Sequence, residues 1–292
     1  MNKILVVNKP NNLTSSFVVN KLKRFFSSSK AGHSGTLDPL AEGVLVIFLG
    51  SMTKIIPFIN ENIKRYKVKM LLGLETDTLD IAGQITKSSG MKELNELDIN
   101  KVVKNFQGEY EYEPPQYSAI RVNGKRSYKN AREGNFVEIP KRKSTISSIR
   151  INKIGSSTLE LDIECSKGTY VRSLVRDIGL ALGTFGTVVN LTRTSTGSFS
   201  LDKSNDFYAL LRGENPEFYE LSNLFPVTVV NKEVVNQLRK LTNHKNVDIS
   251  LISKQLEVNP INIVASNESP LLIVKNKYDD YGKYICSEIK FF

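Results

Sequence analysis

One carboxylate, Asp38, stands in the middle of the stretch Gly32-His33-Ser34-Gly35-Thr36-Leu37-Asp38-Pro39-Leu40-Ala41-Glu42-Gly43. The apolar run 44–49 follows directly and predicts a buried strand. Loops between periodic segments are where a scaffold usually presents reactive groups, and glycines permit close backbone approaches. Glu42 is the only other carboxylate nearby, and its closeness in sequence is weak ground for a glycosidase-type pair of acids. The stretch therefore indicates chemistry built around a single aspartate.

The bulk composition is that of a globular chain. With 292 residues and 40% hydrophobic side chains, it can form one large domain and a small one, and its mean hydropathy is −0.22. No apolar stretch approaches the roughly 18 residues that a membrane helix needs, and the first residues fit a strand better than a signal peptide. Cys165 and Cys286 lie far apart and indicate no disulfide framework. A reducing cytoplasm is the expected compartment.

The chain lacks the usual motifs for metals and nucleotide cofactors. Its two histidines, His33 and His244, are not clustered with cysteines at a zinc-ligand spacing. It contains neither a G-x-x-x-x-G-K-[ST] loop nor a G-x-G-x-x-G fingerprint. We therefore expect a reaction that uses no metal and no cofactor.

Positive charge is concentrated in one segment of the sequence. The chain has a net charge of +10 and a pI near 9.4. Residues 121–143 hold two acidic and eight basic side chains, a net +6, and Tyr117 and Tyr128 lie in or beside them. The basic residues are Arg121, Lys125, Arg126, Lys129, Arg132, Lys141, Arg142 and Lys143. Cations interleaved with aromatic rings favour nucleic-acid binding over a merely solvated loop.

Hydrophobic periodicity predicts strands and helices that alternate without a strict βαβ repeat. Expected strands cover 3–8, 44–49, 64–72, 143–154, 158–165 and 188–192. Expected helices run from 14 or 15 to 28 and over 98–106, 127–132 and 170–182, with a hairpin turn at 122–125. Inward isoleucines at 146, 149, 151 and 154 require one irregularity in their strand. We expect an α+β fold with a mixed sheet.

The last part of the chain is expected to form a small appendage. A break falls near 214–226, where Pro216 and Pro226 flank a short helical piece. Beyond it we expect a helix at 233–241 and short strands at 262–265, 270–275 and 283–289. This mostly β unit is too small for much core of its own, so we expect it to pack on the main domain.

The Asp38 stretch resembles the G-H-x-G-T-L-D-P-x-A-x-G signature of the tRNA pseudouridine synthase B (TruB) family. Six further motifs in the same order extend the resemblance over residues 3–225. They are K-P-x-G-x-[ST]-S at 9–15, K-x-Y at 64–66, T-D-T-x-D-x-x-G at 76–83, P-P-x-Y-S-A at 114–119, Y-x-x-A-R-x-G at 128–134 and C-S-K-G-T-Y-[IV]-R at 165–172. The alternative, that Asp38 merely caps a turn opened by Pro39, does not account for these matches.

The resemblance implies a domain organisation. Residues 1–225 would form a mixed-sheet pseudouridine synthase catalytic domain with an inserted RNA-clasping segment at about 118–145. Residues 226–292 are the candidate for a small, mostly β, PUA-like RNA-binding domain. The implied RNA contacts of the insertion are Lys125, Arg126, Lys129, Arg132, Lys141, Arg142 and Lys143.

The resemblance also implies an activity. The protein would isomerise uridine to pseudouridine in the TψC loop of tRNA, at conventional position 55, by base flipping and with Asp38 as the nucleophile. Implied substrate-binding residues are His33, Tyr66, Tyr170, Arg172 and Leu191. Tyr66 would stack on the base, and Arg172 would pair with Asp38 and keep it ionised. The implied enzyme is a cytoplasmic monomer with tRNA as its partner and without metal, cofactor, membrane or obligatory protein partner.

Departures from the family pattern are few. Asn8 replaces an acidic residue and Asn12 a glycine, and asparagine tolerates the left-handed backbone that such a turn needs. Thr192 and Thr194 stand where the family is often more basic or apolar. Three other functions stay open: an RNA chaperone, a synthase of the same fold acting on ribosomal or small nuclear RNA, and a hydrolase with an aspartyl intermediate. Attack of Asp38 on the sugar or on the uracil ring is equally compatible with the sequence.

Overall fold

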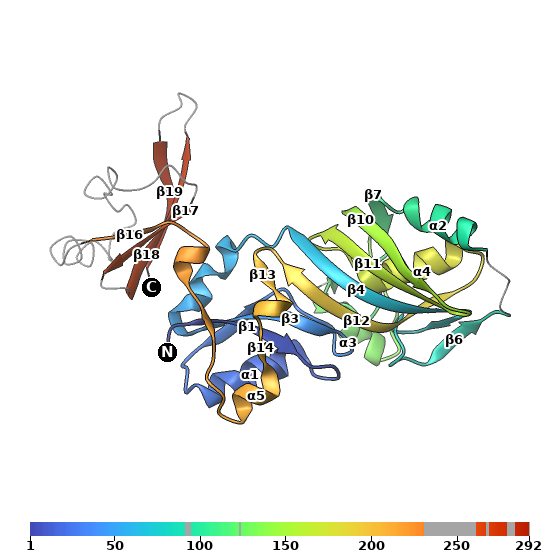
Figure 1. Cartoon of the computed structure of the whole chain (residues 1–292), viewed down its shortest axis with the longest axis horizontal. Helices are drawn as coiled ribbons and strands as arrows, with labels where there is room; N and C mark the ends of the chain where they lie inside the picture. Colours follow the sequence, from blue (N-terminus) through green and yellow to red (C-terminus); the bar gives the residue numbers. More distant parts are fainter. Residues whose placement is uncertain (91–94, 123, 231–260, 267–268, 279–283, 292) are drawn as a thin grey trace.

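The computed structural model describes residues 1–90, 95–122, 124–230, 261–266, 269–278 and 284–291. Its main body is built on one sheet of 11 strands (Figure 1). These are β1 (Ile4–Lys9), β2 (Ala31–Ser34), β3 (Glu42–Leu49), β4 (Ile63–Leu72), β7 (Gly108–Tyr112), β10 (Arg142–Ile154), β11 (Thr158–Ser166), β12 (Gly186–Thr196), β13 (Phe199–Ser200), β14 (Asn205–Asp206) and β15 (Phe218–Tyr219). The order is β14-β1-β3-β12-β4-β11-β10-β7, with β2, β13 and β15 paired beside this path. The β3–β12 and β1–β14 pairs are parallel and the others antiparallel, so the predicted mixed sheet is confirmed.

The two halves of this sheet differ in what covers their faces. In β1, Leu5 and Val6 point to opposite faces and each joins a separate buried apolar cluster. The neighbouring β3 is also buried on both faces, which explains the continuous apolar run 44–49. In β4, by contrast, Val68 is buried while Lys67 is exposed, as the alternating sequence predicts. The face of β4 that carries Tyr66 and Val68 is therefore the buried one.

The helices are α1 (Ser15–Phe25), α2 (Glu96–Lys104), α3 (Ser127–Arg132), α4 (Val171–Ala181) and α5 (Phe207–Leu211), with short 3₁₀ turns η1 (Gly50–Phe58), η2 (Leu201–Lys203) and η3 (Leu221–Asn223). Three of the five helices in the described chain, α1, α2 and α5, begin after a side chain that caps them. Thr14 caps α1 by accepting a hydrogen bond from the Phe17 amide at 3.1 Å. The expected start of α2 at Asp98 is wrong by two residues, because Asn95 caps the helix by accepting from the Asp98 amide at 2.8 Å.

Strand β2 of the main sheet was not predicted, and two other strands differ from their predictions. Strand β2 covers 31–34 and pairs with β3, which shortens the predicted Asp38 loop to 35–41. Strand β12 extends beyond the predicted 188–192 because it pairs along almost all of β4. Strand β10 contains two register shifts instead of one, and only Ile146 and Ile149 of its isoleucines are fully buried.

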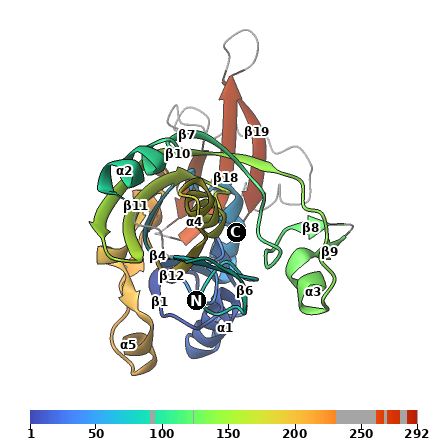
Figure 2. The same ribbon diagram turned by 90° about the vertical axis from the view of Figure 1, so that its right-hand side faces the viewer.

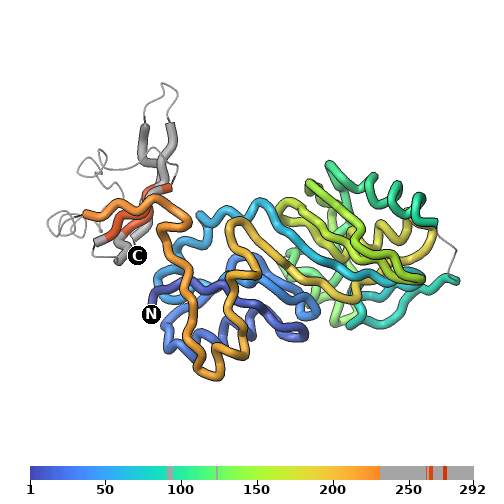
Figure 3. The backbone as a smooth tube through the Cα atoms, in the orientation of Figure 1, coloured from blue at the N-terminus to red at the C-terminus, as the bar shows by residue number. Residues whose placement is uncertain are grey.

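Two small hairpins and a returning segment complete the main body. Strands β5 (Leu74–Thr76) and β6 (Ile85–Ser88) form one hairpin, and β8 (Arg121–Val122) and β9 (Lys125–Arg126) the other. Figure 2 shows β8, β9 and α3 standing away from the sheet. The path of the chain in Figure 3 brings β14 and β15 back to β1, with which both pair.

The C-terminal strands form a separate sheet of four. They are β16 (Val227–Val229), β17 (Ile261–Ser266), β18 (Ser269–Tyr278) and β19 (Tyr284–Phe291), and they match the predicted mostly β appendage. Ile263 and Ile273 share a buried apolar cluster with Val46 and Phe48 of the main sheet. The appendage therefore packs on the main domain as expected, while the helix predicted at 233–241 lies outside the described residues.

A glycine at the start of β3 permits the closest backbone approach beside the Asp38 loop. Gly43 has φ +100°, and a methyl group on it would lie 2.3 Å from the Arg193 carbonyl oxygen. We predict that Gly43→Ala lowers the free energy of unfolding by more than about 2 kcal/mol, measured by urea denaturation. Gly90→Ala is the control, because a methyl group there meets no atom within 4 Å. Equal stability of the two variants would contradict this.

Candidate active site

Two side chains near the start of the chain hold the Asp38 loop in place. The buried Ser15 hydroxyl accepts a hydrogen bond from the Leu37 amide and donates one to the Leu37 carbonyl, both at 2.9 Å. The Lys9 ammonium, at the end of β1, donates to the Pro39 carbonyl at 3.2 Å and to two carbonyls of the following turn, Pro10 and Leu13, at 2.8 and 2.7 Å. The motif at 9–15 thus fixes the residues on both sides of Asp38.

A buried arginine on β12 holds the two ends of the same loop. Arg193 is 1% exposed. Its Nη2 donates to the Gly35 carbonyl at 2.9 Å, and its Nε donates to the Val44 carbonyl at 2.8 Å. The loop is therefore tied at its beginning, middle and end by side chains from three elements, which favours a single orientation of Asp38.

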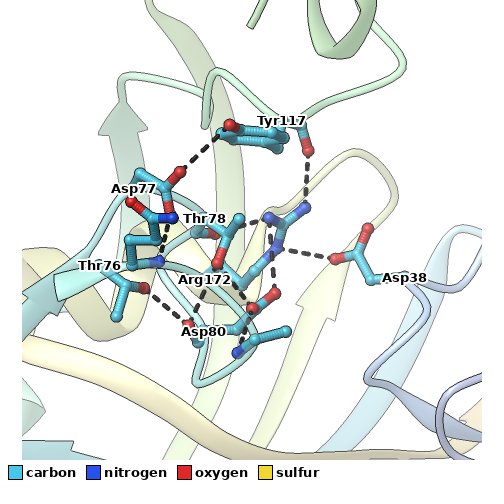
Figure 4. Close-up of polar contacts among 9 residues, drawn as sticks. Asp38, Thr76, Asp77, Thr78, Asp80, Tyr117 and Arg172 are labelled. Carbon is cyan, nitrogen blue, oxygen red and sulfur yellow. Dashed lines mark hydrogen bonds and ion pairs between the residues drawn. The ribbon is translucent and has the colours of Figure 1, made fainter. Parts of the chain in front are cut away.

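Arg172, the second residue of α4, contacts four separate groups around the catalytic candidate (Figure 4). Its Nε lies 2.8 Å from Asp38 Oδ2, in an ion pair without the alignment of a hydrogen bond. Its Nη1 donates to the Thr78 carbonyl at 2.7 Å and lies 3.8 Å from Asp80 Oδ2, and its Nη2 donates to the Tyr117 carbonyl at 3.0 Å. The predicted Arg172–Asp38 pair is confirmed. The arginine itself is 4% exposed, unlike most arginines at a helix start.

The turn after β5 is shaped to present Asp80 to this arginine. Asp80 Oδ1 accepts from the Thr78 hydroxyl at 2.7 Å and from the Ala82 amide at 3.1 Å, which leaves Oδ2 facing the guanidinium. Leu79 between them adopts φ +62°, a left-handed conformation that costs about 1–2 kcal/mol for a residue with a side chain. The motif at 76–83 therefore supplies a second carboxylate to Arg172.

The root of the insertion, residues 116–119, is attached to the same turn. The Tyr117 hydroxyl donates to Asp77 Oδ2 at 3.1 Å, and Asp77 Oδ1 accepts from the Gln84 amide at 2.8 Å. The Gln116 side-chain amide closes the insertion by exchanging two hydrogen bonds with the Val137 main chain, at 2.9 and 3.2 Å. The segment that leads into the insertion thus contacts Arg172 and its supporting turn together.

A pocket of 290 Å³ opens beside the Asp38–Arg172 pair. Tyr66, Tyr170 and Leu191 line it, as do Asp38 and Arg172. The Asp38 side chain is 35% exposed, so its carboxylate is accessible from the pocket although its partner is buried. Five of the six expected catalytic and substrate-binding residues therefore meet in one place.

The aromatic and imidazole groups of the site are held neutral by burial. Burial raises the pKa of Tyr66 to about 12, and burial with the nearby Asp38 charge raises the pKa of Tyr170. Burial, together with the Arg193 charge, lowers the pKa of His33. His33 lies on β2 and is the one expected substrate-binding residue that does not line the pocket. At neutral pH the Tyr66 side chain is a phenol and not a phenolate.

Several residues of the site escape sequence reasoning. Lys9, Lys64, Asp80 and Arg193 are buried polar residues around the Asp38 loop, and Lys64 lines the pocket. Burial lowers the pKa of Lys9 to about 8, partly offset by the negative charges of Asp38 and Glu42. Lys9, Lys64 and Asp80 lie inside the matched motifs at 9–15, 64–66 and 76–83, which is the sequence signal that could have identified them. Arg193 lies in none of these motifs.

The seven expected RNA-binding cations of the insertion are all exposed. Three of them form ion pairs on the surface: Lys125 with Glu133, Lys141 with Glu111, and Lys143 with Glu109. Exposed pairs of this kind contribute little to stability, because water and salt screen the charges. Ala119, at the root of the insertion, lines the pocket, so the insertion begins at the candidate active site.

In the described part of the chain, no three His, Cys, Asp or Glu side chains are grouped so that they could hold a metal ion. No helix among the described residues is long and apolar enough to cross a membrane.

Residues 23–171 match the model of the TruB family pseudouridylate synthase (N terminal domain). The chain belongs to this family. It is 44% identical over 204 residues to "tRNA pseudouridine synthase B" of Clostridium tetani, a match that covers 70% of this chain and 71% of that protein. It is 36% identical over 292 residues to the protein of the same name from Mesoplasma florum, covering 98% of both chains.

Solved structures agree on the fold. The chain in "Crystal Structure of a Cbf5-Nop10-Gar1 Complex" is 19% identical, with a TM-score of 0.66, over 98% of this chain and 84% of that one. The chain in "Crystal structure of the archaeal box H/ACA sRNP Nop10-Cbf5 complex" is also 19% identical, with a TM-score of 0.64, over 99% and 85%. Both alignments extend over nearly the whole chain.

The contacts of Arg172 generate a prediction about rate. A lysine at 172 keeps a positive charge but cannot reach Asp38, Thr78 and Tyr117 at once, because it lacks the planar fork of arginine. We predict that Arg172→Lys lowers the single-turnover rate of product formation on the order of 100-fold, with RNA affinity changed far less.

The control is Arg176→Lys, one turn further along α4, where the arginine pairs with Asp177 and donates to Glu113 without contacting Asp38. A similar decrease in rate for both variants would mean that α4 is generally perturbed and that the Asp38 contact is not the cause.

Proposed function

We propose that this protein converts the uridine at conventional position 55 in the TψC loop of tRNA to pseudouridine, with Asp38 as the nucleophile. The reaction class, isomerisation of uridine to pseudouridine in tRNA, follows from membership of the TruB family and from relatives named tRNA pseudouridine synthase B. The observation that carries the assignment of Asp38 is its ion pair with the buried Arg172 at the mouth of the pocket.

The reaction requires that the C1′–N1 bond breaks, the uracil turns, C5 bonds to C1′, the C5 proton leaves and N1 takes up a proton. A carboxylate can hold the intermediate covalently by attacking either the sugar or the ring. Arg172 supports this role because its buried guanidinium pairs with the Asp38 carboxylate and holds it beside the pocket. Every group in this scheme belongs to the chain or to the RNA, and we propose that no metal or cofactor takes part.

The pocket supports recognition of an extruded base. A base inside an RNA loop must leave its stack to reach Asp38. In the pocket, the flat ring of Tyr66 and the apolar Leu191 offer surfaces for a uracil, and the neutral Tyr66 hydroxyl can exchange a proton with it. Tyr170 lines the same space. We assign His33 to the space next to the flipped nucleotide, on the strand that leads into the Asp38 loop.

The RNA surface is assigned to the insertion and the C-terminal sheet. The seven exposed cations belong to the segment that starts beside Ala119, a residue that lines the pocket. We propose that residues 118–145 clasp the TψC arm, that 226–292 is a PUA-like RNA-binding domain attached to a catalytic domain of residues 1–225, and that the enzyme works as a monomer in the cytoplasm without an obligatory protein partner.

The experiment that tests this function measures pseudouridine at each position of an unmodified tRNA transcript, with purified protein and no added metal or nucleotide. We predict conversion of the TψC-loop uridine by the wild type, none by Asp38→Ala, and similar tRNA affinity for both. Tight binding without product from the wild type would instead indicate an RNA chaperone, and product elsewhere would indicate another target RNA.

The clasping role generates a prediction about salt. Lys141→Glu with Arg142→Glu is expected to weaken tRNA binding and to reduce the slope of log K against log salt by about 0.7–0.9 for each phosphate that the variant no longer binds. The control, Lys101→Glu with Lys104→Glu, changes the charge equally on exposed positions of α2. An unchanged slope in the insertion variant, or the same change in both, would contradict the clasping role.

A further inference from the structure

We propose that Lys64 and Lys167 form a phosphate subsite at the edge of the active-site pocket, which binds an RNA phosphodiester adjoining the flipped uridine. The proposal deepens the proposed function and rests on it. Both lysines line the pocket together with Asp38. Neither belongs to the insertion, so this subsite is separate from the clasping surface.

Most cations around the Asp38 loop are already neutralised or fully bonded. Arg172 lies against the carboxylates of Asp38 and Asp80, and the Lys9 ammonium donates to three carbonyls. Lys64 and Lys167 differ from these cations. The acidic partner of Lys64 is Glu61, with Nζ and Oε2 3.9 Å apart, which is too long for a hydrogen bond. Within the described residues Lys167 forms no ion pair.

Three charged side chains converge on the first residue of the Asp38 loop. A methyl group on Gly35 would lie 3.0 Å from Lys64 Nζ, 3.2 Å from Glu61 Oε2 and 3.4 Å from Arg193 Nη1. One carboxylate thus faces two cations here, and Lys167 adds a third, since its charge acts on the Lys64 ammonium. Burial lowers the pKa of Lys64, and repulsion by Arg193 and Lys167 contributes to that shift. An anion bound between the two lysines would remove this repulsion.

The main chain fixes where Lys167 stands. Its amide donates to the Asn62 carbonyl at 2.9 Å, so the turn after β11 is tied to the start of β4. The turn is closed by the Thr169 hydroxyl, which donates to the Ser166 carbonyl at 2.9 Å, and Gly168 takes φ +93° within it. The Lys167 side chain itself is exposed at the pocket wall. A fixed backbone with an exposed ammonium is suited to bind a ligand from solvent.

The chemistry of the two groups selects the class of ligand. An ammonium offers only donors and a full charge, so two of them favour an anion over the neutral uracil or ribose. RNA carries one anionic phosphodiester for each nucleotide. A uridine that enters the pocket beside Asp38 brings a flanking phosphate to its edge, where Lys64 and Lys167 lie.

The test pairs a protein charge with an RNA charge. Wild type and Lys167→Gln are measured with TψC stem–loop RNAs in which the linkage 5′ or 3′ of the target uridine is native or a neutral methylphosphonate. Equilibrium binding and the single-turnover rate are recorded for each combination. Lys101→Gln, an exposed lysine on α2, is the control for the removal of one charge.

We expect Lys167→Gln to weaken binding of native RNA by about tenfold. Neutralising one of the two linkages should weaken binding by the wild type by a similar factor and leave binding by Lys167→Gln unchanged, because the two changes remove the same interaction. Lys101→Gln should show no such coupling. Additive effects at both linkages would overturn the subsite, as would normal affinity of Lys167→Gln. If the wild type fails to modify the native RNA, the proposed function fails instead.

Lys64→Met provides a second measurement from the buried side of the subsite. Neutralising the linkage that has no effect on binding by Lys167→Gln should also have no effect on binding by Lys64→Met, provided that the thermal unfolding of Lys64→Met matches that of the wild type. Coupling of Lys64 and Lys167 to different linkages, or of Lys64 to neither, would contradict a shared subsite.

Discussion

A buried guanidinium needs carboxylates and carbonyls around it, and in this protein that requirement brings the active site together. Arg172 is almost completely enclosed, and an unpaired charge there would cost several kcal/mol. Its partners come from distant parts of the sequence: Asp38 from the first loop, Thr78 and Asp80 from the turn after β5, and Tyr117 from the root of the insertion. The fold that satisfies the arginine therefore also places Asp38, the turn that supports it and the segment leading into the insertion side by side.

A second set of buried cations gives the Asp38 loop its fixed shape. Lys9 and Arg193 donate hydrogen bonds to main-chain carbonyls and thereby orient the loop. Neither of these hydrogen bonds uses the Asp38 carboxylate, which stays accessible from the pocket. Ser15 adds a reciprocal pair of hydrogen bonds to the residue before Asp38. Such support matters because a nucleophile displaced by about 1 Å can reduce the rate by two orders of magnitude.

Much of this arrangement could be predicted from the sequence, and the rest shows where sequence reasoning stops. Alternation and capping residues located the long strands and four of the five described helices, but not short strands such as β2, β5 and β13. The left-handed backbone expected at Asn12 is present, with φ +64°. The start of α2 was missed because two good capping residues compete within four positions. Lys9, Arg193 and Asp80 were missed because burial of a charged side chain depends on partners far away in the sequence, 30 residues for Lys9 and 158 for Arg193, which local patterns do not record. The motifs contained Lys9 and Asp80 but did not indicate their function.

Asp38 is proposed as the group that meets the target nucleotide, and a crystal structure of Asp38→Asn bound to a TψC stem–loop RNA tests this most directly. We predict an extruded uridine in the pocket between Tyr66 and Leu191, with the residue 38 side chain within about 3.5 Å of C1′ or of a uracil ring carbon. A target uridine that stays stacked in its loop, or one seated away from residue 38, would contradict the assignment.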